Sequence, residues 1–468
     1  MEEQIALLTA NLEAVTQMAQ TTNTMFAETY YFLSIPLMML IHAGFLAYEM
    51  GATRLKNTLS SGIKNLLAFA FTIITFYFFG WWFYWALPTF PMDLSAGMGY
   101  MEISGIAYAN SIALPWGDSA QYMGPNIADN ASGVFWGAFA LFAATTASIM
   151  SGALIERIQT VGFVILAVVL GSGAWIIAAA WGWHADGWLV TEWGVHDFGA
   201  AGLVHAVAGF FALGVLFNLG PRVGKFNADG SANHIAGHNM PLTVVGLMLI
   251  IVGFFGFLMA CIILPGESWS WSADMGTSIY GTRMTLSALA FGIVLAVSGG
   301  IIGAWVFTRD PFWMMSGALA GIISVASGLD IYFPSQIIII SALAGIILKP
   351  CADFVTSLGI DDAVGAVTVH GTIGIYGMLM LGVMASGYPA LDAYAPEGVA
   401  TITFTGQLVS SVVFILLGLV PGYIVSWVLN KAGMLRVPDA VQLKGLDVVK
   451  VPAQAYPEGM TSPASEDT

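Results

Sequence analysis

Two histidines stand at matching positions in two similar stretches of the chain. Each stretch begins with an aspartate, Asp197 or Asp362, continues through seven mostly small or apolar residues, and reaches a histidine, His205 or His370. Both stretches open long apolar segments, in which polar side chains are rare and usually functional. A neutral imidazole both donates and accepts hydrogen bonds, so a buried pair can hold a small polar solute or relay a proton.

A single buried histidine is more often a packing residue whose hydrogen bonds are satisfied. The matched pair favours a functional interpretation, and a glycine four residues after each histidine, Gly209 and Gly374, extends the match. The aspartates have a simpler role open to them, because an aspartate at a helix start accepts hydrogen bonds from the first free amides. We expect Asp362 to be such a cap, whereas Asp197 can be both a cap and a substrate-handling group.

The composition is that of a membrane protein. Hydrophobic residues make up 57% of the 468 residues and charged residues 9%, against about 25% charged residues in ordinary soluble domains. The 54 glycines lie within apolar runs, as in closely packed membrane helices. A net charge of -15 argues against nucleic acid as a partner. Cys261 and Cys351 lie in or beside apolar runs and indicate neither a disulfide framework nor a metal cluster.

Eleven apolar segments follow one another along the chain. Most are long enough to cross a hydrocarbon core of roughly 30 Å at about 1.5 Å per residue. Two short ones, 312–329 and 333–349, could also form a single re-entrant unit. The segments are 30–50, 61–87, 132–153, 160–183, 198–219, 240–264, 283–307, 312–329, 333–349, 363–386 and 404–430.

The basic residues support eleven crossings. With that number, twelve of the 13 Lys and Arg residues fall on one side of the membrane and only Arg283 on the other. The positive-inside rule then places the N-terminus outside and the C-terminus in the cytoplasm. Residues 1–27 lack the basic region of a signal peptide, so we expect an extracytoplasmic arm. The membrane domain would span 28–430, and residues 431–468 would form a cytoplasmic tail.

Sidedness also makes the two Asp-to-His stretches an inverted repeat. Spans one to five (28–219) and six to ten (240–386) each end in such a stretch, and because five is odd the second copy enters from the opposite side. Eight helical residues rise about 12 Å, so both histidines reach nearly the middle of the membrane. The predicted fold is an all-α polytopic membrane protein with a five-plus-five inverted repeat, followed by an eleventh helix at 404–430.

The remaining histidines give weaker signals. His234 and His238 have a spacing that can bind a metal on one helix face, but the segment around them does not look helical and no third ligand is apparent. We therefore predict no metal site and no cofactor. His42, His184 and His196 have no partner that the sequence identifies.

Several further motifs follow one another along nearly the whole chain. They are Ala43-Gly44-Phe45 with Arg54-Leu55-Lys56-Asn57-Thr58, Ser151-Gly152-Ala153-Leu154-Ile155-Glu156-Arg157, His238-Asn239-Met240-Pro241, and Arg436-Val437-Pro438 with Gly445-Leu446-Asp447. Together with the two histidine stretches, these motifs resemble the ammonium transporter family, the Amt/Mep/Rh proteins, and the Amt branch most of all.

The resemblance implies a homotrimer in the cell membrane, with eleven helices and one pore in each subunit. His205 and His370 match the family's two pore-lining histidines, and Phe142 and Phe257 match its stacked phenylalanine gate. The family also implies a tail that couples neighbouring subunits and can meet a PII-type regulator. Without the family, aromatic residues in apolar spans are more often ordinary core residues.

The resemblance also implies an outer recruitment site. Trp183 matches an outer aromatic residue that helps recruit the ammonium ion, and Asp197 matches the family's aspartate near that site. Three positions depart from the family pattern. Cys261 stands where a serine takes part in recruitment, Ala138 where phenylalanine is usual, and Gly365 where an aspartate precedes the second histidine. A thiol is a weaker hydrogen-bonding group than a hydroxyl, so the outer site is the part that these departures affect.

The resemblance implies a transporter for ammonium or ammonia, with methylammonium as an analogue, and we predict no enzymatic reaction. A bare ammonium ion is very costly to bury in an apolar pore, whereas ammonia crosses far more cheaply. We therefore expect the ion to lose its proton near Asp197 and ammonia to pass the histidines. Three alternatives remain open: an ammonium sensor on the same scaffold, a membrane enzyme with histidine metal ligands, and a gas channel of the Rh type. For the sensor, the tail is short for a signalling domain.

Overall fold

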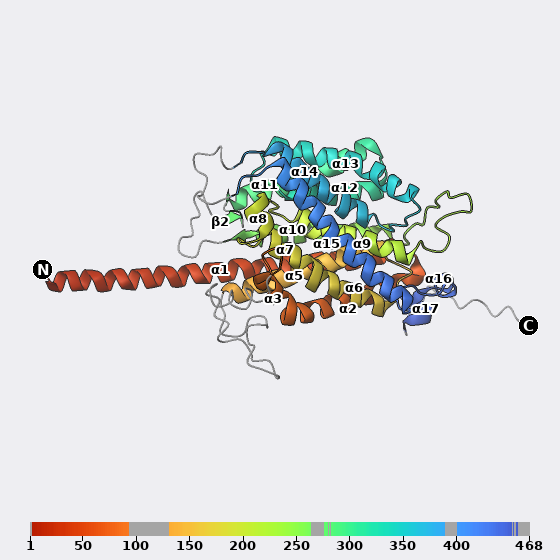
Figure 1. Ribbon diagram of the computed structural model, residues 1–468, viewed down its shortest axis with the longest axis horizontal. Coiled ribbons are helices and arrows are strands. Elements are labelled where there is room, and N and C mark those ends of the chain that lie inside the picture. The colour runs from red at the N-terminus through yellow and green to blue at the C-terminus, as the bar shows by residue number, and fades with distance from the viewer. Residues whose placement is uncertain are drawn as a thin grey trace, which may run out of the picture.

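The computed structural model describes residues 2–92, 131–263, 276–278, 280, 282–388, 400–451, 453, 455 and 456. Most of the long loop predicted at 88–131 lies outside these residues. The long helices pack side by side into one bundle (Figure 1). The helices are α1 (Glu2–Ala52), α2 (Thr58–Thr75), α3 (Trp81–Ala86), α5 (Ala131–Ala153), α6 (Thr160–Val169), α7 (Trp175–Gly182), α8 (Trp188–Trp193), α9 (Val207–Leu219), α10 (Met240–Met259), α11 (Leu286–Phe307), α12 (Pro311–Ala326), α13 (Pro334–Ser357), α14 (Ile373–Met384), α15 (Phe404–Lys431), α16 (Asp439–Lys444) and α17 (Leu446–Lys450).

Ten helical segments in the described part of the chain have at least 18 residues and are apolar enough to cross a membrane. The helix α12 has 16 residues and is a shorter apolar helix. It begins at a cap formed by Asp310, and Ser327 directly after it donates a hydrogen bond to Asp197. Residues 327–333 separate α12 from α13. The helix α13 continues to Ser357, eight residues beyond the predicted end of that span.

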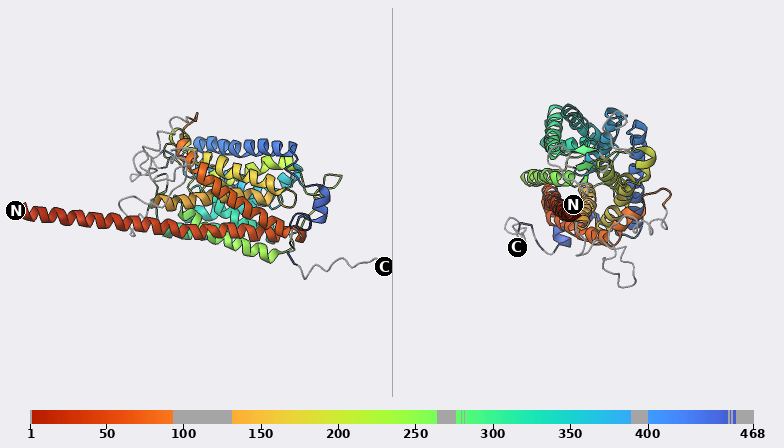
Figure 2. Two further views of the ribbon diagram at one scale, coloured as in Figure 1. Left: turned by 90° about the horizontal axis from the view of Figure 1, so that it is seen from below. Right: turned by 90° about the vertical axis from the view of Figure 1, so that its left-hand side faces the viewer.

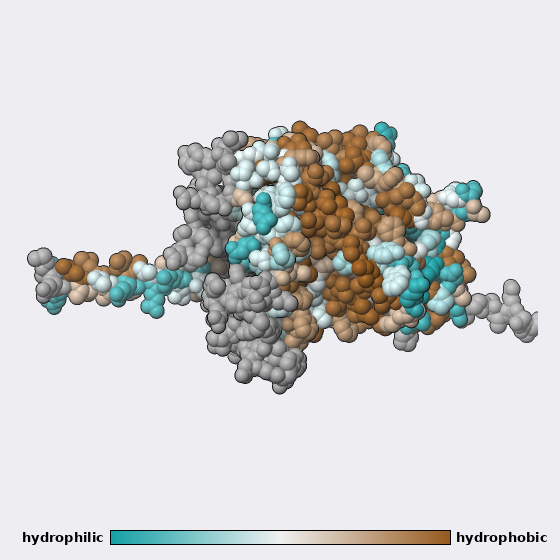
Figure 3. All heavy atoms as spheres, viewed as in Figure 1, coloured by the Kyte–Doolittle hydropathy of each residue, from teal (hydrophilic) through white to brown (hydrophobic). Residues whose placement is uncertain are grey.

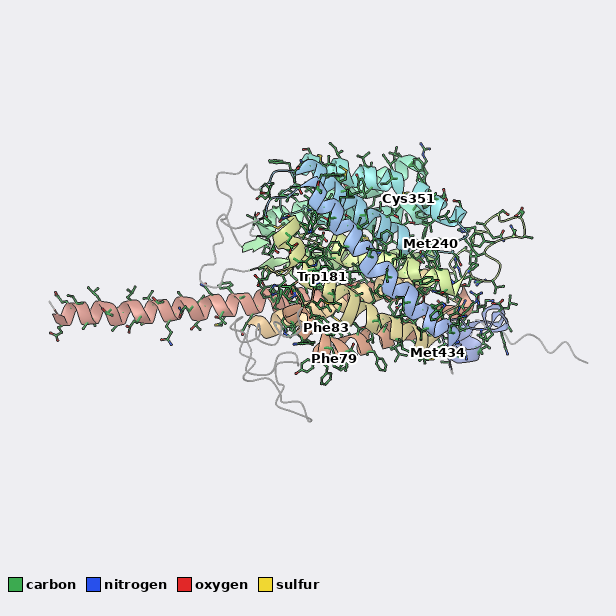
Figure 4. All side chains as sticks on the ribbon, viewed as in Figure 1. Phe79, Phe83, Trp181, Met240, Cys351 and Met434 are labelled. Carbon is green, nitrogen blue, oxygen red and sulfur yellow. The ribbon has the colours of Figure 1, made fainter. Side chains whose placement is uncertain are left out.

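The side chains on the bundle surface form an apolar belt. Figure 3 shows this belt across the middle of the molecule, with more hydrophilic residues toward the two ends. Exposed apolar side chains such as Phe79 contribute to it (Figure 4). Because an apolar surface of this extent is unfavourable in water, the belt is the surface expected to face lipid.

The two ends of the bundle are distinct. We call the end from which the first part of α1 projects the N-face, and the end that carries α16 and α17 the C-face (Figures 1 and 2). Helix α1 is continuous over 51 residues and includes the predicted arm, whose side chains are almost all exposed. At about 1.5 Å per residue this helix is roughly 77 Å long, more than twice the thickness of a hydrocarbon core.

Ion pairs and hydrogen bonds of basic residues hold the C-face together. Asp361 accepts two hydrogen bonds from the Arg222 guanidinium, both at 2.9 Å, and lies 3.7 Å from Arg157. Arg54 pairs with Glu156, while Arg436 donates to the carbonyl of Leu219. These contacts bring the basic residues of four separate segments to one face, in agreement with the predicted clustering.

A small sheet adds three short strands to a fold that is otherwise helical. Strands β1 (Ile262–Ile263), β2 (Gly276–Ser278) and β3 (Arg283–Met284) pair antiparallel in the order β1-β2-β3. Its strands have only two or three residues, which is too short for the alternating pattern that identifies a strand in a sequence.

Candidate transport site

His205 and His370 meet in the centre of the bundle. Both side chains are buried, and their Nδ1 atoms lie 3.0 Å apart. The imidazole rings are nearly parallel, with centroids separated by 5.1 Å and an angle of 24° between their planes. Residues 165 positions apart in the chain therefore form a single hydrogen-bonded unit.

This contact constrains the hydrogens of the pair. In the neutral state one Nδ1 must donate and the other must accept, because two donors or two lone pairs would repel at 3.0 Å. The ring that donates from Nδ1 then has a bare Nε2, and the other ring carries an Nε2–H. The pair thus presents one acceptor and one donor away from the shared bond. Among the described residues, the buried Nε2 of His205 has no hydrogen-bond partner.

The same local structure precedes both histidines. Asp197 accepts hydrogen bonds from the amides of Gly202 and Leu203, and Asp362 accepts them from the amides of Ala366 and Val367. Both aspartates are thus helix caps, as predicted for Asp362 and partly for Asp197.

Three residues after each aspartate the backbone turns left-handed, with φ 63° at Ala200 and 79° at Gly365. Glycine adopts this conformation without steric cost, whereas Ala200 adopts it with a Cβ in place. Each histidine then lies in a π-helical segment, η6 (Ala201–Ala206) or η7 (Val367–Thr372), a feature often found at functional sites.

The glycines that follow the histidines let the two segments cross closely. A Cβ atom on Gly209 would lie 2.2 Å from the backbone nitrogen of Gly371, and one on Gly374 would lie 2.9 Å from that of Ala206. Each glycine therefore packs against the residue directly after the opposite histidine. Small residues are what allow membrane helices to approach to this distance, and here the approach brings the imidazoles into contact.

Aromatic rings connect the histidine pair with the N-face end of the bundle. Trp183 contacts Phe142 with ring centroids 5.2 Å apart, Phe142 contacts Phe257 at 4.4 Å, and Phe257 lies parallel to His205 at 6.0 Å. The two phenylalanines meet edge to face, at 70°, and not stacked as the resemblance implies. Edge-to-face contacts are favourable because the positive ring edge meets the negative ring face. Five of the seven predicted site residues thus form one continuous series of rings.

The other two predicted residues lie beside this series. Asp197 is fully buried, accepts a hydrogen bond from Ser327, and its carbonyl oxygen accepts one from the Trp183 indole. Cys261 is buried as well, and its thiol donates to the carbonyl oxygen of Phe257 at 3.4 Å. Both residues are therefore held against members of the ring series.

Some neighbours of the site were not predicted. His196, which had no partner in the sequence analysis, forms a buried pair with Asp330 at 3.0 Å and lies parallel to the Tyr280 ring at 4.3 Å. Phe45 follows His370 on the other side of the pair, with ring centroids 6.4 Å apart. No sequence spacing links these residues, because each comes from a different segment of the chain.

The remaining histidines also acquire neighbours. His184 accepts a hydrogen bond from the amide of Asp186, and His42 lies near Thr145 and Ser148. His238 hydrogen-bonds to the carbonyl of Thr53 and to the Tyr456 hydroxyl. In the described part of the chain, no group of three or more metal-ligating side chains is present.

The buried histidine pair and the adjoining aromatic rings are the residues that the family resemblance singled out. The family model described as Ammonium Transporter Family matches residues 29–456. The chain belongs to the ammonium transporter family. It is accordingly a multi-pass membrane protein, and the match begins just after the predicted N-terminal arm, residues 1–27.

Curated relatives share this family over most of their lengths. The ammonium transporter Amt2 of Archaeoglobus fulgidus is 28% identical over 442 residues, covering 90% of this chain and 86% of the relative. Amt2 of Methanocaldococcus jannaschii is 28% identical over 458 residues, covering 96% and 97%.

Solved structures show the same fold. The structure named Sensor Amt Protein aligns with a TM-score of 0.74 at 22% identity and covers 92% of this chain and 99% of its own. Mep2 of Saccharomyces cerevisiae aligns with a TM-score of 0.67 at 17% identity, covering 88% and 87%. At these identities the likeness concerns the fold alone.

Proposed function

We propose that this ammonium transporter family member conducts ammonium or ammonia across the cell membrane through the path marked by His205 and His370. The ion is recruited at the N-face by Trp183, the Phe142–Phe257 gate and nearby acidic charge, through cation–π and electrostatic attraction. It loses its proton near Asp197, ammonia passes the histidine pair, and the pair relays the proton in a separate step. In this proposal Cys261 tunes the recruitment site.

The observation that carries the proposal is the unpaired Nε2 of the buried His205, beside a second histidine at 3.0 Å. A buried polar nitrogen without a partner is unfavourable, so its retention points to a ligand that completes its hydrogen bonds. Ammonia both donates and accepts, and therefore suits a pair that presents one donor and one acceptor. An ammonium ion would have to give up its hydration in an apolar surrounding, at far greater cost.

The proposed architecture comprises eleven crossings with the N-face outside and the C-face in the cytoplasm. The corresponding caps, left-handed residues and glycines of the two histidine segments support an inverted repeat. The family supports a homotrimer, with a C-terminal tail that can meet a PII-type regulator. Methylammonium is the expected transported analogue.

Currents in proteoliposomes test the proposal. A pulse of ammonium should produce a transient current with the intact protein, and His205→Ala, with its fold verified by thermal unfolding in detergent, should lose the current or change its ion selectivity. Ser410→Ala, which removes a buried hydroxyl not assigned to the path, should keep both. If His205→Ala behaves like the unaltered protein, the proposed path is wrong.

A sensor is the second candidate, because a structure named Sensor Amt Protein shares this fold. Such a protein would bind ammonium without efficient transport. Binding of ammonium without current or methylammonium uptake would favour the sensor and refute the transporter.

A further inference from the structure

A carboxylate that the proposed path does not use is buried beside it. Glu49, near the C-face end of α1, is only 1% exposed. Its Oε2 accepts a hydrogen bond from Asn65 at 3.0 Å and lies 3.6 Å from the Lys64 ammonium, both on α2. Its Oε1 accepts a hydrogen bond from Ser151 on α5. A buried charge of this kind is costly, and its partners come from two helices, α2 and α5, that pack beside α1.

Glu49 and His370 line the same cavity, on the side of the histidine pair away from the ring series. Phe45, Tyr48 and Val364 also contribute to its wall. Val364 lines in addition the large cavity that opens on the C-face, together with Arg222 and Asp362. The His370 cavity and the C-face cavity therefore adjoin at Val364.

We propose that Glu49 is the proton acceptor of this half of the path. The step rests on the proposed function, in which a proton leaves the substrate and travels separately from ammonia. A protonated His370 loses an N–H proton, through water in the cavity, to a carboxylate oxygen of Glu49, and an O–H bond replaces the N–H bond. The neutral carboxylic acid then releases this proton toward the C-face, which restores the carboxylate and leaves the pair neutral.

The surroundings of Glu49 permit this change of charge. Lys64 keeps other partners when the carboxylate is neutral, because its ammonium donates to the carbonyl of Ser151 and lies 4.6 Å from the centre of the Phe163 ring. The Ser151 hydroxyl also reaches the carbonyl of Ser148 at 2.7 Å. Protonation of Glu49 therefore leaves neither Lys64 nor Ser151 without a hydrogen-bond acceptor. A carboxylate needed only as a counter-charge for Lys64 would require no cavity beside it.

The test separates a proton acceptor from a counter-charge. Glu49→Gln removes the acceptor but also removes the negative charge opposite Lys64. The decisive variant is therefore Glu49→Gln combined with Lys64→Met, which removes both charges. Ammonium-evoked current and ammonia flux, followed by the pH change inside vesicles, are measured on the same proteoliposomes. We expect the current of the double variant to be roughly tenfold or more below that of the unaltered protein, while its ammonia flux persists. Glu49→Asp, which keeps a carboxylate, should retain the current.

Glu156→Gln is the matched control, since Glu156 is a buried carboxylate paired with Arg54 that does not line the His370 cavity. It should keep the current. A double variant that carries the current of the unaltered protein would overturn the role of Glu49, as would joint loss of current and ammonia flux in a folded protein. If the unaltered protein carries no current, the proposed function fails instead.

Discussion

The close crossing at Gly209 allows a quantitative test of how the histidine pair is held. An alanine there would place its Cβ 2.2 Å from the Gly371 nitrogen, about 1.2 Å inside the 3.4 Å at which ordinary contact begins. The obstacle is backbone, so no side-chain rotation can relieve it. If the segments separate by that amount, the His205–His370 distance grows from 3.0 Å to about 4.2 Å, beyond hydrogen-bonding range.

We therefore expect Gly209→Ala to destabilise the protein by about 1–3 kcal/mol through overpacking, and to abolish most of the ammonium-evoked current. Gly173→Ala is the control, because a Cβ on Gly173 meets nothing within 4 Å. Thermal unfolding in detergent and currents in proteoliposomes provide the two measurements. Equal unfolding temperatures and equal currents for the two variants would refute the idea that this crossing positions the imidazoles.

Three further substitutions test other parts of the structure. Burial would raise the pKa of Asp361, but hydrogen bonds and charge from Arg222, with the charge of Arg157, hold that pKa well below its usual range. The ionised Asp361 side chain therefore stabilises the fold at pH values above its unfolded-state pKa, and this effect is lost only as the pH falls through the depressed value. At neutral pH, Asp361→Asn should lower the free energy of unfolding by about 3–5 kcal/mol. The unfolding temperature of the variant should be lower across pH 5–8. Asp447 accepts hydrogen bonds from the first amides of α2, so Asp447→Ala should cost about 1 kcal/mol and make the tail more sensitive to trypsin, whereas unchanged cleavage would exclude this tether. Cys261→Ser keeps a donor for the Phe257 carbonyl, so it should leave the unfolding temperature unchanged and raise the current at low ammonium concentration; a lower current would contradict a recruitment role for this position.

The helical framework could be predicted because its signals are local. The apolar segment predicted at 160–183 corresponds to a span at Thr160–Gly182, and the one predicted at 404–430 to α15 at Phe404–Lys431. Hydropathy alone identifies such segments, since each must be long and apolar by itself. The convergence of His205 and His370 also followed from local information, namely the repeat and the number of crossings between its copies.

The parts that were missed depend on contacts between distant segments. Glu49 is one acidic residue near the end of a span, and nothing adjacent to it in the chain indicates that Lys64 and Ser151 will surround its carboxylate. The edge-to-face geometry of the phenylalanines similarly depends on how α5 and α10 are rotated against each other. Periodicity predicts which face of a helix is buried, but not the residue that it will meet there.

The local symmetry of the histidine segments does not extend to the surroundings of the pair. Toward the N-face, His205 meets an aromatic series, whose ring faces attract a cation without offering a proton acceptor. On the opposite side, His370 shares a cavity with the carboxylate of Glu49. In the path that we propose, the same local structure, an aspartate cap followed by a π-helical segment, therefore positions both imidazoles, but their surroundings differ. Replacing only the second histidine, as His370→Ala, should then impair the proton current more than the recruitment of ammonium. An equal loss of both would contradict these different roles for the two sides of the pair.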